Sequence, residues 1–157
     1  MMCQGVSIDW REFLDWHIER YRLAWRSLTR TEEAEREYLF LYKQTPRELP
    51  VWCDGELFVA EWGARNRATR LPSSGWCPRE VLEGGTWREW QPLLGEIPAM
   101  YAYDGNVWFQ VPKGIQAVVL SDQKGSKHVY VLTQPSSRYY EVMTRQDRMP
   151  VFLGEQI

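Results

Sequence analysis

The sequence has few of the residues from which common catalytic and metal centres are built. Its 157 residues include two histidines and three cysteines, Cys3, Cys53 and Cys77. No two of the cysteines have the CxxC spacing of a zinc site or a redox motif, and an odd number argues against a disulfide framework. We therefore expect free thiols in a reducing cytoplasm, with no metal and no other cofactor.

The familiar enzyme motifs are also missing. The chain contains no GxGxxG, no GxxxxGK, no HExxH and no GxSxG, which removes the usual nucleotide, zinc-protease and serine-hydrolase interpretations. The two histidines are weak candidates for a general base. His17 falls on the apolar side of a helical pattern, which is typical of a core histidine, and His128 begins an alternating strand, where it faces either solvent or a cleft.

Long apolar runs and an excess of positive charge are absent as well. No run approaches the ~18 residues of a membrane span, and residues 1–9 lack the features of a signal peptide, so we expect no membrane partner. The formal net charge of −2 is unlike the bulk basicity of most nucleic-acid binders. Lysine is scarce, since fifteen of the nineteen basic residues are arginine. This bias suits planar recognition of phosphate or carboxylate, although the base composition of the gene can produce it too.

A helical pattern opens the chain. Apolar and aromatic residues recur at helical spacing over residues 10–28, and Asp9 with Glu12 resembles a capping box. These features predict an N-terminal amphipathic helix that packs an aromatic stripe on a sheet. A second, short helix is expected to start at Thr29 or Thr31.

The rest of the chain is dominated by short runs of β-branched and aromatic residues. With 44% hydrophobic residues and nine tryptophans, the chain can bury one core, and we expect a single domain over residues 1–157. The predicted strands are residues 49–53, 56–62, 99–103, 107–111, 115–121 and 128–133. Turn-like links such as Asp54-Gly55 separate them, as hairpins require. The sequence therefore predicts an α+β fold with a mainly antiparallel β core and few short helices.

The stretch from Gly63 to Gly95 is irregular and dense in glycine, proline, tryptophan and arginine. Its arginines, which include Arg65 and Arg79, alternate with tryptophans, which include Trp76. A long irregular stretch in a compact domain is usually functional or disordered, and tryptophan argues against disorder. We interpret it as a binding loop in which arginines hold phosphates and aromatic faces stack on unpaired bases. In the alternative interpretation, the tryptophans seal a small core and the arginines are solvated.

A cysteine lies almost at the start of the chain. A chain that begins at Cys3 would carry an α-amine with pKa ~8 beside a thiol with pKa ~8.5, and this pair can trap an aldehyde as a five-membered ring. The chemistry requires that Met1 and Met2 are removed. The alternative is a start-adjacent cysteine with no role.

Six short motifs follow one another along nearly the whole chain. They are Met2-Cys3-Gln4-Gly5, Tyr42-Lys43-Gln44-Thr45-Pro46, Trp62-Gly63, Cys77-Pro78-Arg79, Tyr103-Asp104-Gly105 and Gln146-Asp147-Arg148-Met149-Pro150-Val151-Phe152-Leu153. In this order they resemble the motifs of the SRAP family (SOS-response-associated peptidase domain). The closing motif is the most specific, since it is similar to the family's His-Asp-Arg-Met-Pro-Val-Ile-Leu.

The resemblance implies a barrel-like core and a role in protecting abasic sites in single-stranded DNA. In that family the terminal cysteine condenses with the ring-opened sugar aldehyde to form a thiazolidine crosslink, assisted by an asparagine, a glutamate and a histidine. The nucleophile would be Cys3, and the histidine position holds Gln146. The asparagine and glutamate positions fall on Cys77 and on Trp108 or Gln110. Because proton transfer contributes ~10²–10⁴-fold in rate and Gln146 cannot take a proton, we expect weak or absent crosslinking.

Three functional hypotheses follow. The first is an SRAP-like protein that binds single-stranded or abasic DNA and uses Cys3 for covalent attachment. The second is a noncovalent nucleic-acid or protein interaction module on the same fold. The third is a peptidase, against which the missing histidine counts. The candidate nucleic-acid contacts are Pro46, Arg65, Trp76, Arg79 and Arg148.

Overall fold

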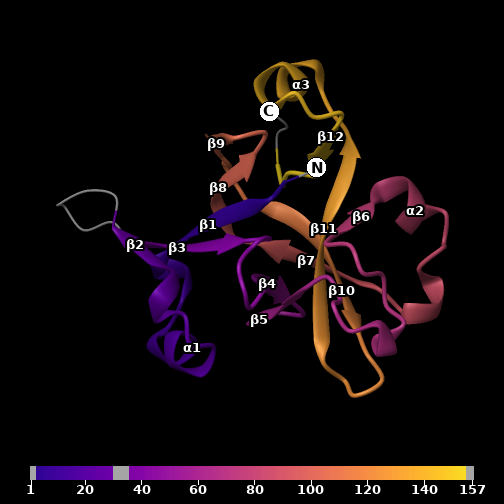
Figure 1. Cartoon of the computed structure of the whole chain (residues 1–157), viewed down its shortest axis with the longest axis horizontal. Helices are drawn as coiled ribbons and strands as arrows, with labels where there is room; N and C mark the ends of the chain where they lie inside the picture. The colour runs from indigo at the N-terminus through magenta and orange to yellow at the C-terminus, as the bar shows by residue number, and fades with distance from the viewer. Residues whose placement is uncertain (1–2, 30–35, 155–157) are drawn as a thin grey trace.

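The computed structural model describes residues 3–29 and 36–154, in which strands dominate and the helices are short (Figure 1). The strands are β1 (Gly5–Asp9), β2 (Ser27–Thr29), β3 (Arg36–Leu41), β4 (Glu48–Cys53), β5 (Glu56–Trp62), β6 (Trp76–Pro78), β7 (Leu93–Ile97), β8 (Ala99–Asp104), β9 (Val107–Gln110), β10 (Ile115–Ser121), β11 (Lys127–Pro135) and β12 (Arg148–Pro150). The α-helices are α1 (Asp15–Arg20), α2 (Arg79–Glu83) and α3 (Arg138–Thr144), and the 3-10 helices are η1 (Trp10–Glu12), η2 (Ala24–Arg26), η3 (Arg67–Thr69) and η4 (Arg88–Trp90). In these described ranges, no helix is long and apolar enough to cross a membrane.

The strands form two sheets. The strands β10, β7, β4, β5 and β11 make a closed barrel, because β10 pairs with both β7 and β11. The other sheet has the order β2-β3-β1-β8-β9. Most neighbours are antiparallel, but β11 runs parallel to β5 and to β6. The expected α+β class with a barrel-like core is therefore found, with a mixed strand arrangement in the barrel sheet.

Strand β11 holds the barrel sheet together. It pairs antiparallel with β10 and β12 and parallel with β5 and β6. All its residues from His128 to Gln134 are buried. A strand covered on both faces reads as a continuous apolar run, which explains the Val129–Leu132 sequence.

The six predicted strands are confirmed within one or two residues at their ends. Turn chemistry made them recognisable. Asp54 and Gly55 both have positive φ, at 52° and 76°, as the type I′ turn between β4 and β5 requires. Gly105 and Asn106 do the same between β8 and β9, at 56° and 62°. The sequence thus specifies these hairpins locally.

The single helix predicted over residues 10–28 is wrong. Asp9 does cap a helical turn by accepting the Arg11 N–H at 2.9 Å, but this turn is the 3-10 helix η1, and an extended residue follows it. Helix α1 begins after Leu14, whose N–H is held by Nδ1 of His17 at 2.9 Å. His17 is buried, as expected of a core histidine, and the segment breaks again after α1.

The expected aromatic stripe packs on a sheet only in part. Phe13 is buried against Tyr38 and Phe40 of β3, with ring centroids 5.3 and 6.3 Å away. Trp10 and Trp25, at the two ends of the stripe, instead expose 47% and 52% of their surface. Thr29 ends strand β2 rather than starting a helix, and Thr31 lies outside the described residues.

The segment from Gly63 to Gly95 covers the β10–β11 hairpin. Its centre forms η3, β6, α2 and η4, and Trp87 packs edge-on against Tyr130 of β11, with ring centroids 5.0 Å apart. Trp62, Trp76 and Trp87 are all buried. The interpretation that these tryptophans seal a core is therefore confirmed for these three.

Arg26 is a buried cation that joins the N-terminal segment to the barrel. Its fully buried guanidinium donates hydrogen bonds to the main-chain oxygens of Leu39 and Pro46, at 3.2 and 2.7 Å, and to Oε1 of Gln44 at 2.8 Å. It also pairs with Glu48 at 2.9 Å. Burial lowers the pKa of Arg26, and Glu48 opposes this shift by stabilising the charged form. One side chain thus fixes η2, β3 and the loop before β4.

Replacing Arg26 should be costly. We expect Arg26→Ala to lower the free energy of unfolding by about 3 kcal/mol, because it leaves buried acceptors and a carboxylate without their partner. The exposed Arg11, which pairs with Asp9 at 2.7 Å, provides the control, and Arg11→Ala should change stability by no more than about 1 kcal/mol. Urea denaturation measures both, and equal losses in the two variants would contradict this account.

Candidate nucleic-acid interface

Cys3 lies directly before β1, between strands β3 and β8. The N–H of the next residue, Gln4, donates to the Tyr103 oxygen, and the Gln4 oxygen accepts from the Tyr42 N–H, both at 2.8 Å. The thiol is 3.6 Å from the Gly5 oxygen, and the side chain is fully buried. The start of the described chain is therefore fixed in the sheet.

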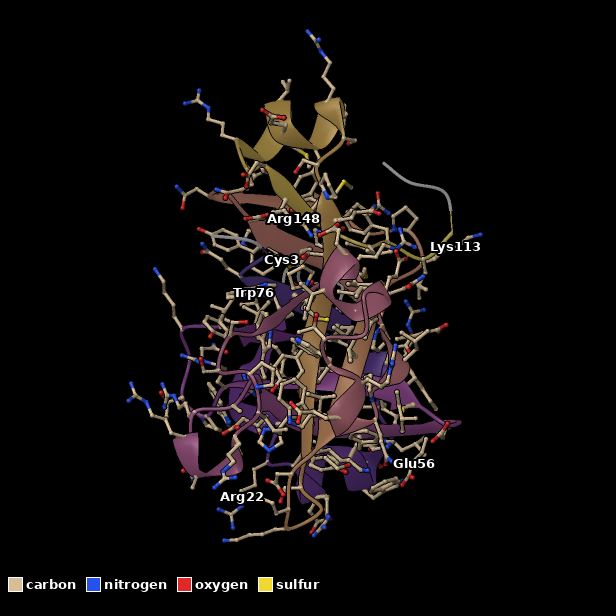
Figure 2. All side chains as sticks on the ribbon, turned by 90° about the vertical axis from the view of Figure 1, so that its right-hand side faces the viewer. Cys3, Arg22, Glu56, Trp76, Lys113 and Arg148 are labelled. Carbon is tan, nitrogen blue, oxygen red and sulfur yellow. The ribbon has the colours of Figure 1, made fainter. Side chains whose placement is uncertain are left out.

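Tyr42, Trp62 and Trp76 form an aromatic cluster. Figure 2 shows Trp76 of this cluster beside Cys3. The Trp76 indole donates to the Cys3 oxygen at 2.8 Å, and its ring centroid is 4.5 Å from that of Tyr42. The Trp62 indole donates to the Gly75 oxygen at 2.8 Å. A β-carbon on Gly75 would lie 2.6 Å from Trp62 Nε1 and 2.7 Å from the Tyr42 ring, so only glycine allows this packing.

Arg47 continues the aromatic cluster toward the surface. Its Nε donates to the Tyr42 oxygen at 2.8 Å, and its guanidinium carbon lies 3.7 Å from the centre of the Tyr42 ring. This is the geometry of a cation–π contact. Trp76, Tyr42 and Arg47 therefore form a continuous stack that starts at Cys3.

Two of the predicted contacts, Pro46 and Arg65, line one cavity of about 300 Å³ beside this stack. Its lining residues, which we call the basic groove, are Thr45, Pro46, Arg47, Glu48, Glu61 and Arg65. Glu48 pairs with Arg26 at 2.9 Å, and Glu61 lies 3.0 Å from Nδ1 of His128. Arg65 is exposed and has no acidic partner in the described part of the chain. The groove therefore offers two arginines to an anion.

The other two predicted arginines, Arg79 and Arg148, meet at the end of β11. Arg79 donates to Oε1 of Gln134 at 2.8 Å, and Arg148 donates to Oγ1 of Thr133 at 3.2 Å. Each arginine also pairs with an acid of α2, at 3.4 and 3.0 Å respectively. Figure 2 shows Arg148 in the same region as Cys3. A phosphate bound here would have to displace these carboxylates.

Gln146 is half-buried between α3 and β12. Its N–H donates to Oγ1 of Thr144 at 3.2 Å, and its main-chain oxygen accepts from Oγ of Ser136 at 2.8 Å. These bonds fix its backbone. A role for its side chain at Cys3 stays a prediction.

Asp104 and Tyr140 were missed by sequence reasoning, although the negative charge of Asp104 raises the pKa of the Cys3 thiol and Tyr140 is the hydrogen-bond partner of Asp104. Tyr140 donates to Oδ2 of Asp104 at 2.5 Å, while Oδ1 is buried without a hydrogen-bond partner among the described residues. Burial raises the pKa of Asp104 to about 6, and the Tyr140 hydrogen bond partly offsets this rise. In the sequence, Asp104 is explained by the turn at Gly105. Its partner is 36 residues away, so no local pattern signals the pair.

The Cys3 thiol is not activated in the 157-residue chain. Burial, and then the negative charge of Asp104, raise its pKa to about 12. Burial raises the pKa of Cys77 to about 12 and raises that of Cys53 as well. All three cysteines are free and buried. None of them is a thiolate near neutral pH.

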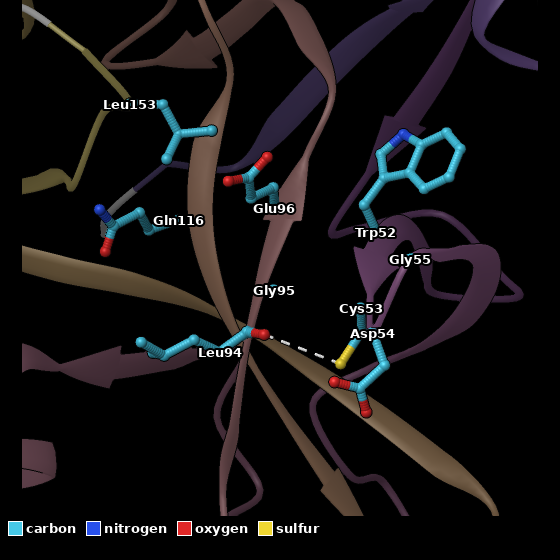
Figure 3. Close-up of a pocket in the computed structure, with 9 residues that line it drawn as sticks. All are labelled: Trp52, Cys53, Asp54, Gly55, Leu94, Gly95, Glu96, Gln116 and Leu153. Carbon is cyan, nitrogen blue, oxygen red and sulfur yellow. Dashed lines mark hydrogen bonds between the residues drawn. The ribbon is translucent and has the colours of Figure 1, made fainter.

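A cavity of about 470 Å³ near Cys53 has the wrong chemistry for a phosphate. It is lined by Trp52, Cys53, Asp54, Gly55, Leu94, Gly95, Glu96, Gln116 and Leu153 (Figure 3). The Cys53 thiol donates to the Leu94 oxygen at 3.7 Å. The two ionisable groups with a charge at neutral pH, Asp54 and Glu96, are both acids.

His128 is buried at the wall of a cavity of about 690 Å³, which Glu61 and Asp122 also line, so of its two predicted surroundings the structure shows a cleft. Its Nε2 contacts Asp122 at 3.0 Å, and its Nδ1 contacts the Gly63 oxygen at 2.8 Å. Within residues 3–29 and 36–154, no group of three or more histidine, cysteine and acidic side chains is placed to hold a metal ion.

Comparison with known proteins identifies the fold and not a family. No family model matches the sequence, and no curated protein matches it. The structure is similar to the crystal structure of a protein from Bacteroides thetaiotaomicron solved by a structural genomics consortium, with a TM-score of 0.58 and 14% sequence identity. The match covers 98% of this chain and 78% of that chain. Similarity at this identity shows a shared fold alone.

Asp104 should make stability depend on pH. Because its pKa is raised from 3.8 to about 6, the native state keeps a proton that the unfolded chain has lost, and stability falls as the pH rises from about 4 to about 6. Asp104→Asn removes the ionisation, so its stability relative to wild type should increase by about 2–3 kcal/mol between pH 4 and pH 7. Urea unfolding at a series of pH values measures this.

Tyr140→Phe is the second arm of this experiment. It removes the hydrogen bond that lowers the pKa of Asp104, so the fall in stability should shift to higher pH. If the free energy of unfolding of wild type and of Asp104→Asn changes with pH in parallel, the buried carboxyl does not titrate as described.

Proposed function

We propose that the protein binds single-stranded DNA along the basic groove, with the strand running toward Cys3. The observation that supports this most is the stack of Trp76, Tyr42 and Arg47, which connects the Cys3 backbone to Arg47 in the basic groove, where Arg65 also lies. Proteins usually bind single strands with a basic groove that holds the phosphates and with aromatic side chains beside it. In this proposal Arg47 and Arg65 hold the phosphates.

The aromatic cluster favours a nucleotide without a base at its inner end. Trp76 is only 7% exposed and Trp62 is fully buried, so neither offers a free face on which a base can stack. Tyr42, the half-buried member, carries Arg47 on one face. A bare sugar needs less space beside this cluster than a nucleotide that carries its base, which favours an abasic site as the preferred lesion.

Covalent attachment requires a chain that begins at Cys3. The α-amine then attacks the C1 aldehyde of the ring-opened sugar, water leaves as the imine forms, and the thiol adds to the imine carbon while its proton passes to the nitrogen. Asp104 is suited to move these protons, because a carboxyl with a pKa of about 6 exists in both forms near neutral pH. It supplies the proton transfer that Gln146 cannot.

The decisive experiment compares protein that begins at Met1 with protein cleaved to begin at Cys3. After incubation with an abasic oligonucleotide, only the second form should give a band that survives denaturation, because an acylated Cys3 nitrogen cannot form the imine. Cys3→Ala should abolish the band, and Cys53→Ala, which removes another buried thiol, should leave it. A band of equal strength in Cys3→Ala would remove Cys3 from the proposal.

The runner-up function is noncovalent binding in the same groove. It is favoured by one observation, the complete burial of the Cys3 thiol and its raised pKa. In this case no denaturation-stable band forms with either N-terminus, while binding of intact single strands persists.

Noncovalent binding can be tested independently of Cys3. Arg65→Ala should weaken binding of single-stranded DNA about three- to tenfold at 0.1 M salt and reduce the slope of log affinity against log salt by about 0.7, because one phosphate contact is lost. Arg138→Ala, an exposed arginine of α3, is the matched control and should have no effect. Fluorescence anisotropy with a labelled oligonucleotide measures both, and an identical response of the two variants would place the strand elsewhere.

A further inference from the structure

Trp25 is an exposed indole held on a rigid support. The guanidinium carbon of Arg26 lies 4.2 Å from the centre of its ring. The same guanidinium carbon lies 4.6 Å from the centre of the Phe40 ring, and hydrogen bonds to Pro46 and Glu48 hold the group in place. Trp25 nevertheless exposes 52% of its surface. One face of the indole is thus fixed while the rest is open to solvent.

A rigid aromatic face is well suited to stack on a ligand ring. Ordering a mobile side chain on binding costs about 0.5–1.5 kcal/mol, and a ring already held in place avoids most of this cost. Base–aromatic stacking does not depend on the identity of the base, because every base has a π-face. Because Arg26 fixes the Trp25 indole, a ligand ring can stack on it at a low entropic cost. A side chain that only faces solvent would gain nothing from being fixed in this way.

The surroundings of Trp25 are positively charged. It lines a cavity of about 420 Å³ whose other lining residues are Arg20, Tyr21, Arg22, Pro46 and Glu48. Arg20 and Arg22 are exposed, and neither has an acidic partner among the described residues. The one carboxylate of the cavity, Glu48, is neutralised by Arg26. An anion is therefore favoured next to the indole.

This cavity adjoins the basic groove. Pro46 and Glu48 line both cavities. A DNA strand bound to Arg47 and Arg65 that continues across Pro46 would therefore reach Trp25. Figure 2 shows Arg22 near the bottom of the molecule, well below Cys3 and Arg148, which lie closer to its middle. The cavity is thus positioned to bind nucleotides of the strand that lie far from Cys3.

We propose that the cavity of Trp25, Arg20 and Arg22 is a stacking subsite for one unpaired base of a DNA strand, with the flanking phosphates on the two arginines. This inference rests on the proposed function, because it extends the same strand path. It adds a residue, Trp25, that lies outside all six sequence motifs, and it makes affinity depend on strand length.

The test measures the affinity of the full-length chain for labelled oligothymidines by fluorescence anisotropy. Single-strand sites on OB-fold domains span about 4–16 nucleotides, so strands of about 4 and about 16 nucleotides give a short and a long probe of the path. Trp25→Ala should weaken binding of the long strand about tenfold and leave the short strand, which the basic groove can hold alone, nearly unchanged. Trp25→Phe keeps an aromatic face and should retain most of the affinity.

Matched controls make the result specific. Trp16→Ala removes an equally exposed indole, 50% against 52%, that does not line the cavity, and it should not affect binding. Arg22→Ala should lower the salt slope for the long strand only, by about 0.7. In a separate experiment on the wild-type chain, photo-crosslinking of a strand that carries 5-iododeoxyuridine, followed by peptide mass spectrometry, should identify Trp25 as the attached residue.

The outcomes separate the two proposals. If Arg65→Ala weakens binding of the long strand while Trp25→Ala does not, or if Trp16→Ala weakens it as much as Trp25→Ala, the subsite is wrong and the basic groove remains. The absence of a crosslinked peptide that contains Trp25 also overturns the subsite. If the wild-type chain binds neither strand, the proposed function fails and the subsite fails with it.

Discussion

The whole arrangement depends on β11 finding hydrogen-bonding partners along both of its edges. Four strands pair with it, and they bring together segments that are distant in the sequence: Trp62 at the end of β5, Trp76 at the start of β6 and Arg148 at the start of β12. A buried strand cannot leave its N–H and C=O groups without partners, so these pairings are obligatory. The aromatic cluster next to Cys3 and the arginine pair at the far end of the strand both follow from them.

The sequence predicted those parts of the fold that local chemistry determines. The Asp54-Gly55 turn is visible in the sequence and predicts the β4–β5 hairpin, and the structure confirms both strands. The helix over residues 10–28 failed because its periodic apolar residues meet different surroundings: His17 enters the core while Trp10 and Trp25 face solvent. The spacing of apolar residues shows which side chains one helix face could bury. Whether a single helix forms depends on the tertiary contacts available to that face.

The candidate site divides in the same way. Pro46 and Arg65 were predicted from the sequence, and they line the same cavity. The sequence could not show that Arg65 has no acidic partner among the described residues whereas Arg79 bonds to Gln134 and Glu83, because these neighbours are set by the fold. Asp104 and Trp25 were missed for a related reason. In the sequence, Asp104 looked like a turn residue and Trp25 like part of a helical apolar pattern. Their roles depend on contacts with distant or buried groups, Tyr140 for Asp104 and the Arg26 guanidinium for Trp25.

The position of Cys3 before a central strand has a mechanical consequence. Strand β1 lies between β3 and β8, so its hydrogen bonds on both sides run across the strand axis. A pull applied at Cys3 along β1 would load these bonds together in shear, whereas a pull at a hairpin tip would open them one after another. The start of β1 is therefore a part of the sheet that resists traction better than the hairpin tips do.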